Sequence, residues 1–443
     1  MTCLAPMKEW QFWIDRGGTF TDVVARRPDG TLVTAKLLSE DPERRYDAAE
    51  AAIRQLTGAG DGPLQPCTIR IGTTIATNAL LEREGEPVLL AITRGFGDAL
   101  TIGYQDRPDI FARDIRRAPP LFAEVVEIDE RVAEDGTVLT PLDEAAAAAA
   151  FAKAYAEGLR SVAIVLVHGW RHQAHEAKLA DLAQAAGFTQ ISVSHRTAPL
   201  IRLVARGDTT LVDAYLSPVL RRYVQGLEAS LDEAAAGGLL FMQSSGGLVA
   251  ADRFGGKDAL LSGPAGGIVG MARTAQGAGF DRIIGFDMGG TSTDVSLYAG
   301  SYDRRSDAVL AGVRVAVPMM RIDTVAAGGG SICHFDGGRL LVGPASAGAD
   351  PGPACYRRGG PLTVTDCNMV LGKLQPDYFP ALFGPNRDLP PDRQAAEAAL
   401  DALLDQVAAA TGERLDRFAA AEGMVAIAVA NICLLYTSPS PRD

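Results

Sequence analysis

The stretch DMGGTSTDV at residues 287–295 decides the fold, because nearly the same stretch occurs once before in the chain. The earlier copy reads DRGGTFTDV at residues 15–23, and the two copies differ only at their second and sixth positions. Each copy follows a short apolar run and leads into another, which predicts a strand, a glycine turn and a second strand. A repeat placed in this way predicts two similar halves, with a boundary near residue 200.

The repeated turn has the composition of a phosphate-binding hairpin. Its paired glycines permit a tight turn and leave no Cβ to block a ligand, so their N–H groups can face phosphate oxygens. The leading carboxylates, Asp15 and Asp287, stand at strand ends, where they can hold Mg²⁺ directly or through water. One such hairpin is a weak signal, whereas two facing hairpins can hold a triphosphate from both sides.

A third glycine-rich segment, at residues 325–331, is a candidate nucleoside contact. An apolar run breaks there into three consecutive glycines, so that a sugar or base can lie against the backbone. The segment lacks the GxGxxG spacing of a dinucleotide site and the GxxxxGK[ST] spacing of a P-loop. A dehydrogenase and a P-loop ATPase are therefore disfavoured.

Helices and strands are expected to alternate between residues 140 and 194. Thr140 precedes Pro141 and is the expected N-cap of an alanine-rich helix. Residues 162–167 form an apolar run that predicts a buried strand, and a helix over 174–186 and a strand over 191–194 follow. Together with strands expected over the first forty residues, this βαβ rhythm predicts an α/β fold.

Composition and charge narrow the class of protein. The 443 residues are 47% hydrophobic and 22% charged, as in a soluble globular protein. Lys+Arg minus Asp+Glu is 42 − 54, a net charge of −12, which disfavours binding to nucleic acid or to an anionic membrane. The scattered cysteines form no CxxC pair, and no apolar run reaches the roughly 20 residues of a spanning helix. A cytoplasmic protein is expected.

Several motifs in order resemble the hydantoinase/oxoprolinase family of the actin-like ATPase superfamily. Besides the two hairpins, they are GTTIATNALLE (72–82), TRGF (93–96), SGPAGG (262–267) and GPASAGADPGP (343–353). The resemblance extends to about residue 433 and implies an actin-like ATPase (ribonuclease H-like) fold with a duplicated lobe. Within the family, Arg16 and residues 36–40 and 102–111 are similar to the 5-oxoprolinase branch.

The resemblance implies ATP-dependent hydrolysis of the lactam of 5-oxo-L-proline to L-glutamate, a reaction of glutathione metabolism. Amide resonance makes the lactam carbonyl a poor electrophile. The family solves this by phosphorylating the carbonyl oxygen with ATP, after which water attacks the activated carbon. The implied cofactors are ATP and Mg²⁺.

Residue roles follow from the same resemblance. Asp15 and Asp287 are expected to be catalytic and to organise Mg²⁺. The residues expected to face phosphate are Gly17, Gly18, Thr19 and Thr21 on one side, and Gly289, Gly290, Thr291 and Ser292 on the other. Those expected at the nucleoside are Gly329, Gly330 and Ser331, and those expected at the substrate are Thr73, Thr74, Thr77 and Asn78. For Thr73 and Thr74 a helix cap is an equally good interpretation, and Asp22 and Asp294 are expected to anchor the turns by bonding backbone N–H groups.

The family pattern also implies a domain organisation. We expect an N-terminal domain over residues 1–200 with the first hairpin, and an incomplete second domain over 201–433 with the second. The pattern stops inside a helix expected from Phe418 to about Cys433, and residues 434–443 are expected to be a non-native tail. The expected partners are a small cyclic amide and a hydantoinase B-like half, fused or separate, in a homo- or hetero-oligomer.

Alternatives remain open from the sequence. A hydantoinase A or ketone carboxylase subunit would share the ATP site, a sugar kinase would phosphorylate a hydroxyl, and an actin-like switch protein would have no substrate. Residues 72–82 and 262–267 favour the metabolic family over the switch protein. His168, His172 and His175 lie close together, but a shared metal is not the favoured interpretation. Residues 206–210 are expected to begin a helix with a buried charge pair.

Overall fold

The computed structural model describes residues 9–39, 44–105, 113, 118–231, 238–325, 327–379, 381–384 and 388–437. Four earlier expectations touch residues outside these ranges. They concern Glu40, residues 106–111 of the stretch 102–111, Ala326 in the third glycine segment, and residues 438–443 of the expected tail.

The first hairpin lies inside a six-stranded sheet of order β12-β11-β4-β1-β2-β3. Its strands are β1 (Trp10–Arg16), β2 (Phe20–Arg26), β3 (Leu32–Leu38), β4 (Cys67–Thr73), β11 (Leu239–Met242) and β12 (Leu248–Ala250). The expected strands of the first forty residues are thus confirmed. Phe12 and Ile14 point to the same face, as alternation in a strand requires, and both are buried in one apolar core with helix α1 (Ala48–Thr57).

A second sheet, of order β10-β9-β5-β6, is entirely parallel. Its strands are β5 (Val88–Thr93), β6 (Phe122–Ile128), β9 (Ser161–Val165) and β10 (Gln190–Val193), and the helices that pack beside it are α4 (Glu144–Ala156) and α5 (Ala174–Ala186). The α/β prediction is confirmed. One detail was wrong: Asp143 caps α4 by accepting a hydrogen bond from the N–H of Ala146, whereas Thr140 ends the short strand β8 (Val138–Thr140).

The second hairpin belongs to a smaller sheet, β13-β14-β19. Its strands are β13 (Arg282–Met288), β14 (Thr293–Ala299) and β19 (Asp323–Val325). The two-stranded ribbons are β7 (Arg131–Val132) with β8, β15 (Arg304–Arg305) with β18 (Met319–Met320), β16 (Ala308–Leu310) with β17 (Val313–Val315), and β20 (Ser331–Phe335) with β21 (Leu340–Ser346). Among the described residues, β13 pairs with β14 alone, so its other edge is open.

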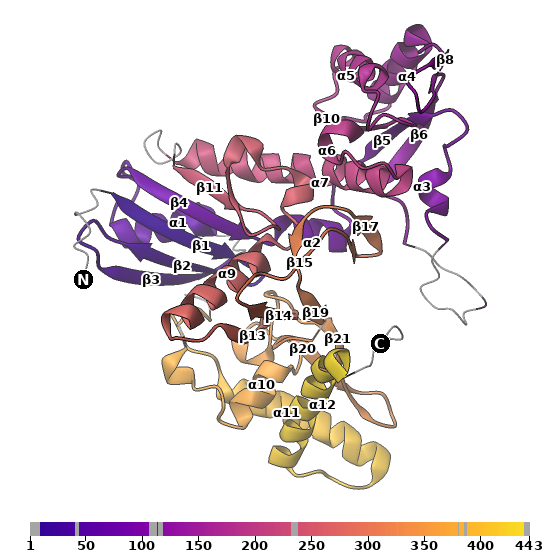
Figure 1. Ribbon diagram of the computed structural model, residues 1–443. Helices are drawn as coiled ribbons and strands as arrows, with labels where there is room; N and C mark the ends of the chain where they lie inside the picture. The colour runs from indigo at the N-terminus through magenta and orange to yellow at the C-terminus, as the bar shows by residue number, and fades with distance from the viewer. Residues whose placement is uncertain are drawn as a thin grey trace.

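Helices connect these sheets. They are α2 (Ile75–Glu82), α3 (Ala99–Ile102), α6 (Ser194–Thr197), α7 (Leu203–Ser230), α9 (Ser262–Gly277), α10 (Val364–Val370), α11 (Arg393–Thr411) and α12 (Arg417–Thr437). Figure 1 shows the parallel sheet at one end of the molecule, the six-stranded sheet in the middle, and α10, α11 and α12 at the opposite end. Helix α9 contacts both β4 and β13 and so links the two hairpin-bearing sheets.

The expected division at residue 200 stays a prediction. The six-stranded sheet draws β1 to β4 from one side of that position and β11 and β12 from the other. At the far end of the chain, α12 runs through Thr437, so the first residues of the expected tail continue this helix.

Candidate functional site

The two glycine turns have the same backbone geometry. In the first, the N–H of Gly17 donates to the carbonyl of Phe20 over 3.0 Å, and in the second the N–H of Gly289 donates to the carbonyl of Ser292 over 2.9 Å. Asp15 lies opposite Asp22 across the first hairpin, just as Asp287 lies opposite Asp294 across the second. The repeated sequence therefore makes a repeated structure.

The tips of the two hairpins lie against each other. A Cβ placed on Gly290 would lie only 3.1 Å from Oγ1 of Thr19, and a Cβ on Gly18 would lie 3.3 Å from the side-chain nitrogen of Asn78. A side chain at either position would press on the facing side chain, which would have to shift by a few tenths of an ångström. The fold thus brings together two turns that are more than half the chain apart in sequence.

Asp15 stands beside backbone from two other motifs. Gly263, near the start of α9, would place a Cβ 3.3 Å from Oδ1 of Asp15, and Gly72, near the end of β4, would place one at 3.8 Å. Ser262 joins these two segments, since its hydroxyl donates to the carbonyl of Thr73 over 2.8 Å and accepts from the N–H of Thr73 over 3.1 Å. The motifs at 72–82 and 262–267 therefore meet at the first carboxylate.

The surroundings raise the pKa of Asp15 to about 6. Solvent reaches the side chain, but the protein atoms around the carboxylate displace much of its water, and this desolvation is the largest cause. The negative charges of Asp22 and Asp287 raise the pKa further, while the ammonium of Lys36 opposes them. Asp15 and Asp287 are thus close enough to repel each other, as two carboxylates around a shared cation site would be.

The second acid of each hairpin is bound by the neighbouring strand. Both carboxylate oxygens of Asp22 accept hydrogen bonds from Nζ of Lys36 over 2.7 Å. The corresponding Asp294 accepts from Oγ1 of Thr324 over 2.6 Å, and burial is the main cause of its raised pKa. Both acids therefore tie the hairpin to the neighbouring strand through side chains, and not through backbone N–H groups as expected from the sequence.

The hydroxyls in the turns divide into two groups. Thr21 is fully buried and its hydroxyl bonds to that of Ser39, which in turn donates to the carbonyl of Gly17. The structure gives Thr21 a bracing role, and its contact with phosphate stays a prediction. Thr291 is exposed at the second tip, Ser292 and Thr19 are half-buried, and their phosphate contacts are likewise predictions.

The third glycine segment packs directly on the second hairpin. The N–H groups of Gly329 and Gly330 donate to the carbonyls of Gly289 and Gly290 over 2.9 and 2.6 Å. Ser331 is buried, and its hydroxyl accepts from the N–H of Gly328 over 3.0 Å. Of the three residues expected at the nucleoside, Gly330 and Ser331 are buried and Gly329 is partly exposed. The segment positions the hairpin, and its contact with a nucleoside stays a prediction.

The four polar residues expected at the substrate have different roles. Thr73 is buried, and its hydroxyl accepts from the N–H of Ile75, the first residue of α2. Thr74 stands at the N-cap position of α2 but makes no capping hydrogen bond with its side chain. The hydroxyl of Thr77 accepts from the N–H of Leu261 over 3.1 Å. Thr74 has its methyl group near Gly263, and Asn78 reaches Gly18. The last two residues thus lie beside the first hairpin.

Several residues around this site had no role in the sequence prediction. Gly72, Ser262 and Gly263 stood in motifs that were recognised, but their contact with the first carboxylate could not be inferred from one chain segment. Arg16, which marked the 5-oxoprolinase branch, lies over the ring of Tyr223 at 5.2 Å and 3.5 Å from a carboxylate oxygen of Asp47. Its role in the structure is therefore packing behind the hairpin.

The histidines and the buried arginine have structural partners. His175 bonds to Glu130 over 2.9 Å, and Nε2 of His172 lies 2.8 Å from the carbonyl of Glu134. Arg206 is fully buried in the first turn of α7, which begins at Leu203. The expected charge pair within residues 206–210 is not formed, because the guanidinium of Arg206 donates to the hydroxyl of Ser194 and to backbone carbonyls instead. Within the described ranges, no cluster of three or more His, Cys, Asp or Glu side chains is arranged to hold a metal ion. No helix in those ranges is long and apolar enough to cross a membrane.

Comparisons with known proteins identify the family of this chain. The family model described as Hydantoinase/oxoprolinase matches residues 206–434, and that of the Hydantoinase/oxoprolinase N-terminal region matches residues 11–187. The chain is 44% identical to 5-oxoprolinase 1 of Arabidopsis thaliana, over 90% of this chain and 34% of the relative. It is 39% identical to 5-oxoprolinase of Saccharomyces cerevisiae, over 95% and 36%. The chain spans about a third of the length of these relatives.

This chain covers a larger share of some other relatives. Caprolactamase subunit alpha of Pseudomonas jessenii is 37% identical over 95% of this chain and 61% of the relative. Among solved structures, the ATP-dependent caprolactamase of the same organism matches with a TM-score of 0.72 and 34% identity, over 96% of this chain and 62% of that one. Nucleotide-free acetone carboxylase matches with a TM-score of 0.78 at 24% identity, over 95% and 61%, which bears on the fold alone.

Proposed function

The chain belongs to the hydantoinase/oxoprolinase family and has an actin-like ATPase fold, and from this premise we propose that it is the ATP-binding part of an enzyme that hydrolyses 5-oxo-L-proline to L-glutamate. The observation that carries the proposal is the meeting of the two glycine hairpins at Thr19 and Gly290, with Asp15 and Asp287 close enough to interact. The relatives named 5-oxoprolinase support the choice of lactam.

In this proposal the hairpins hold the triphosphate between them. Gly18 and Thr19 on one side, and residues 290–292 on the other, supply N–H and hydroxyl donors. Such donors stabilise the negative charge on phosphate oxygens without having to reorganise during the reaction. The N–H groups of Gly17 and Gly289 are already bonded within their own turns and brace them. Thr21 and Thr293 support the turns from behind, since the hydroxyl of Thr293 donates to the carbonyl of Ala327 over 2.6 Å.

The two leading carboxylates fit a magnesium site. Burial is the main cause of the raised pKa of Asp15, and the charge of Asp287 adds to it. A divalent cation between the two carboxylates would relieve their repulsion. Mg²⁺ takes oxygen ligands and keeps several waters, so one or two carboxylates together with substrate phosphates suffice. Asp15 and Asp287 would hold the ion, which when bound neutralises charge on the phosphates.

Contact with this centre supports the remaining role assignments. Asn78 and Thr74 lie beside the first hairpin and are the residues we assign to the substrate side. Gly329 is partly exposed, whereas Gly330 and Ser331 are buried, and we assign Gly329 to the nucleoside. Transfer of the terminal phosphoryl group to the lactam oxygen would make the carbonyl carbon electrophilic. Attack by one water and cleavage of the C–N bond, with a proton going to the nitrogen, would open the ring and leave an acyl phosphate. A second water would then release phosphate and give glutamate.

A second candidate function uses the same ATP site with another carbonyl compound. It is favoured by the caprolactamase subunit and by the 32% identical acetophenone carboxylase gamma subunit of Aromatoleum aromaticum. These two relatives are named as subunits, and we therefore propose that this chain also works with a hydantoinase B-like partner, fused or separate. A larger lactam, a hydantoin or a ketone would then replace 5-oxoproline.

The test is the release of ADP and glutamate by the chain together with the remaining part of its enzyme, with Mg²⁺ and with or without 5-oxo-L-proline. Equal amounts of ADP and glutamate are expected. Asp287→Ala should lower the rate by about a hundredfold or more, as when a preorganised charge-stabilising group is removed. The matched control is Asp181→Ala, which changes an exposed aspartate on α5 and should leave the rate unchanged.

The other outcomes separate the candidates. Stimulation by caprolactam, a hydantoin or a ketone, but not by 5-oxoproline, would retain the ATP site and contradict the substrate. ATP turnover that no carbonyl compound stimulates would instead favour an actin-like switch protein. A stable phosphorylated sugar would indicate a kinase.

A further inference from the structure

Strand β13 lies at an edge among the described strands but has the composition of an internal strand. Its seven residues read RIIGFDM and include neither lysine nor proline. Edge strands are usually short or carry lysine or proline, because their unpaired backbone groups attract other strands. The six-stranded sheet follows this rule, since its edge strand β12 has three residues and its other edge strand, β3, carries Lys36. Strand β13 is therefore suited to a neighbour on its open side.

The internal repeat shows which kind of neighbour fits there. Its alignment superimposes β1 on β13, residue for residue. Strand β14 takes the place of β2 and β19 that of β3, because Asp294 lies opposite Thr324 as Asp22 lies opposite Lys36. In the first sheet β1 has a further neighbour, β4, which runs parallel to it along all seven residues. Among the strands that the structure describes, none stands beside β13 in this way.

The backbone groups at the open edge are directed toward such a strand. Hydrogen-bonded and non-bonded residue pairs alternate along two antiparallel strands. Because the second turn closes with a bonded pair, the N–H and C=O groups of Ile284, Phe286 and Met288 point away from β14. The first hairpin has the same pattern. There the carbonyl of Arg16, the counterpart of Met288, accepts from the N–H of Thr74, just beyond β4, over 3.1 Å.

One face of the open strand is apolar and exposed. Ile284 and Phe286 are 68% and 60% exposed, whereas their counterparts Phe12 and Ile14 are buried beneath α1. In the first half, α1 stands between β3 and β4 in the sequence, so the covering helix and the adjacent strand come as one unit. A helix followed by a strand would therefore fill both the open edge and the uncovered face of the second sheet.

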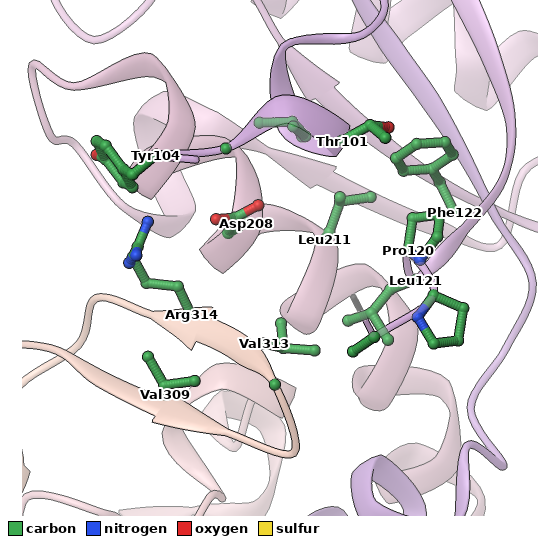
Figure 2. A pocket seen from close by; sticks show the side chains of 15 residues that line it. Thr101, Tyr104, Pro120, Leu121, Phe122, Asp208, Leu211, Val309, Val313 and Arg314 are labelled. Atoms are coloured by element: carbon green, nitrogen blue, oxygen red, sulfur yellow. The ribbon is translucent and has the colours of Figure 1, made fainter. Parts of the chain in front are cut away.

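This surface suits a polypeptide better than a small molecule. A cavity of about 490 Å³ lies elsewhere, between α3, α7 and the β16–β17 hairpin, and none of its lining residues belongs to β13 (Figure 2). Small-molecule sites are concave, whereas β13 presents a row of backbone groups beside exposed apolar side chains. An extended strand recognises such an edge through main-chain hydrogen bonds.

The described part of this chain does not supply the helix and strand. Its residues after β19 form β20, β21 and helices α10 to α12, and none of these pairs with β13. The stretches outside the described ranges are at most eight residues long, too short for a helix and a strand together. A second copy of β13 also fits poorly, because two copies of one strand related by a two-fold axis run antiparallel, whereas the repeat calls for a parallel neighbour.

We propose that the part of the enzyme outside this chain supplies a helix and a strand that complete the second sheet, with the strand parallel to β13 and the helix on Ile284 and Phe286. This chain covers 34% of 5-oxoprolinase 1 and 61% of caprolactamase subunit alpha, so such relatives have further polypeptide for this unit. By the repeat, the added strand ends beside Asp287, as β4 ends near Asp15, where a Cβ on Gly72 would lie 3.8 Å from Oδ1. The docking does not depend on the substrate, whereas its effect on ADP binding rests on the proposed function.

The experiment measures hydrogen exchange of single amides by mass spectrometry, in this chain alone and in the chain together with the remaining part of its enzyme. In this chain the outward amides of Ile284, Phe286 and Met288 should exchange about a hundredfold faster than the inward amides of Gly285 and Asp287. In the complete enzyme the three outward amides should slow by about a hundredfold. Fast exchange there overturns the proposal. So does slow exchange in this chain alone, and sedimentation of that chain as a dimer would then identify a second copy as the cover.

Phe286→Asp tests the helix on the apolar face. In the complete enzyme it should restore fast exchange of the Ile284 and Met288 amides and weaken ADP binding by about tenfold, because the second hairpin loses support. In this chain alone, where the side chain is already exposed, ADP binding should stay within about twofold of the parent. The control is Leu32→Asp on the edge strand β3, which replaces a side chain that is 63% exposed and should change neither quantity.

These outcomes separate the docking from the proposed function. ADP release that no lactam stimulates, with the outward amides still protected in the complete enzyme, contradicts the function and supports the docking. Protection that survives Phe286→Asp in the complete enzyme would show that no helix covers this face and overturns the proposal. Lost protection with unchanged ADP binding overturns the contribution of the added unit to the phosphate site.

Discussion

The carboxylate of Asp15 is the residue whose chemistry depends most on its neighbours. A carboxyl group next to paired glycines in an isolated hairpin would titrate near its ordinary value. Here the surrounding protein and the charges of Asp22 and Asp287 raise the pKa to about 6. Asp15 is therefore ionised at neutral pH but loses its charge within a mildly acidic range.

This pKa predicts how cation-dependent nucleotide binding responds to pH. As pH falls from 7.5 through 6 to 5, Asp15 takes up a proton and Mg²⁺-dependent ADP binding should weaken, as calorimetry can measure. Asp15→Asn should bind more weakly at every pH and flatten the dependence, whereas the control Asp181→Asn should follow the parent. A parent profile without change between pH 5 and 7.5 would contradict the role of Asp15.

The same shift has an opposite consequence for stability. The folded chain holds this proton more tightly than the unfolded chain, so the contribution of Asp15 to stability is complete below pH 4 and is lost as pH rises through 6. The gain in the free energy of unfolding that Asp15→Asn causes, relative to the parent, should therefore be larger at pH 7 than at pH 4. Urea unfolding at the two pH values measures the difference, and a penalty at pH 7 would contradict the prediction.

Arg206 is a second residue with a large expected effect. It is fully buried, and its guanidinium donates to the hydroxyl of Ser194 over 2.9 Å and to the carbonyls of Leu166 and Leu200. Glu176, also fully buried, accepts from the same Ser194 hydroxyl. The network joins the start of α7 to the parallel sheet.

Arg206→Leu should lower the free energy of unfolding by about 3–5 kcal/mol, because it leaves the carbonyls of Leu166 and Leu200 without this donor and removes a positive charge near the buried Glu176. Arg222→Leu on the same helix is the control. That arginine is 62% exposed and pairs with Glu86, so its loss should cost less than about 1 kcal/mol. Urea unfolding compares the two, and equal costs would mean that the buried network adds no stability.

At the scale of elements, the third glycine segment packs tightly on the second hairpin. A Cβ on Gly328 would lie 2.8 Å from the carbonyl carbon and oxygen of Gly290 and 2.9 Å from the carbonyl oxygen of Gly289. These are backbone atoms, which cannot swing aside as a side chain can. The segment and the hairpin therefore hold one relative position.

Gly328→Ala should push the second hairpin away from the first. We expect a loss of about 1–3 kcal/mol in the free energy of unfolding, the usual size for overpacking, and weaker ADP binding. The control is Gly270→Ala in α9, where a Cβ would meet no atom within 4 Å. Alanine in a helix interior should stabilise by about 0.5–1 kcal/mol there. If ADP binds equally well to both variants, the segment does not position the hairpin.

At the scale of the whole molecule, both halves contain the hairpin, but its apolar side chains are buried in the first half and exposed in the second. The repeat aligns Ile14 with Phe286 and Phe12 with Ile284. In the first sheet these side chains are 4% and 0% exposed, whereas their counterparts in the second are 60% and 68% exposed. Helix α1 covers that face of the first sheet, and no described element covers the equivalent face of the second.

This asymmetry predicts opposite outcomes for equivalent substitutions. Ile14→Ser should lower the free energy of unfolding by about 2–5 kcal/mol, as for loss of a buried aliphatic side chain. Phe286→Ser should change it by less than about 0.5 kcal/mol and should reduce the binding of a hydrophobic dye to the chain. Urea unfolding and dye fluorescence measure both, and a large loss of stability in Phe286→Ser would show that this face is buried in solution.

The sequence by itself determined the two hairpins, the strands around them, the parallel βαβ unit and the family. These features depend on local patterns, since paired glycines, apolar alternation and helix-forming runs act over a few residues. Even there, the cap of α4 was assigned to Thr140 when the acceptor is Asp143, because several capping side chains lay close together in sequence.

Only the tertiary structure decided which of these segments meet. It placed Thr19 against Gly290 and Asp15 beside Gly263, and it used the hydroxyls of Thr73 and Thr77 for backbone contacts. The physical reason is that such contacts join residues far apart in the chain. Packing and desolvation select them, and a pattern read along one segment carries no information about the atoms that will surround it.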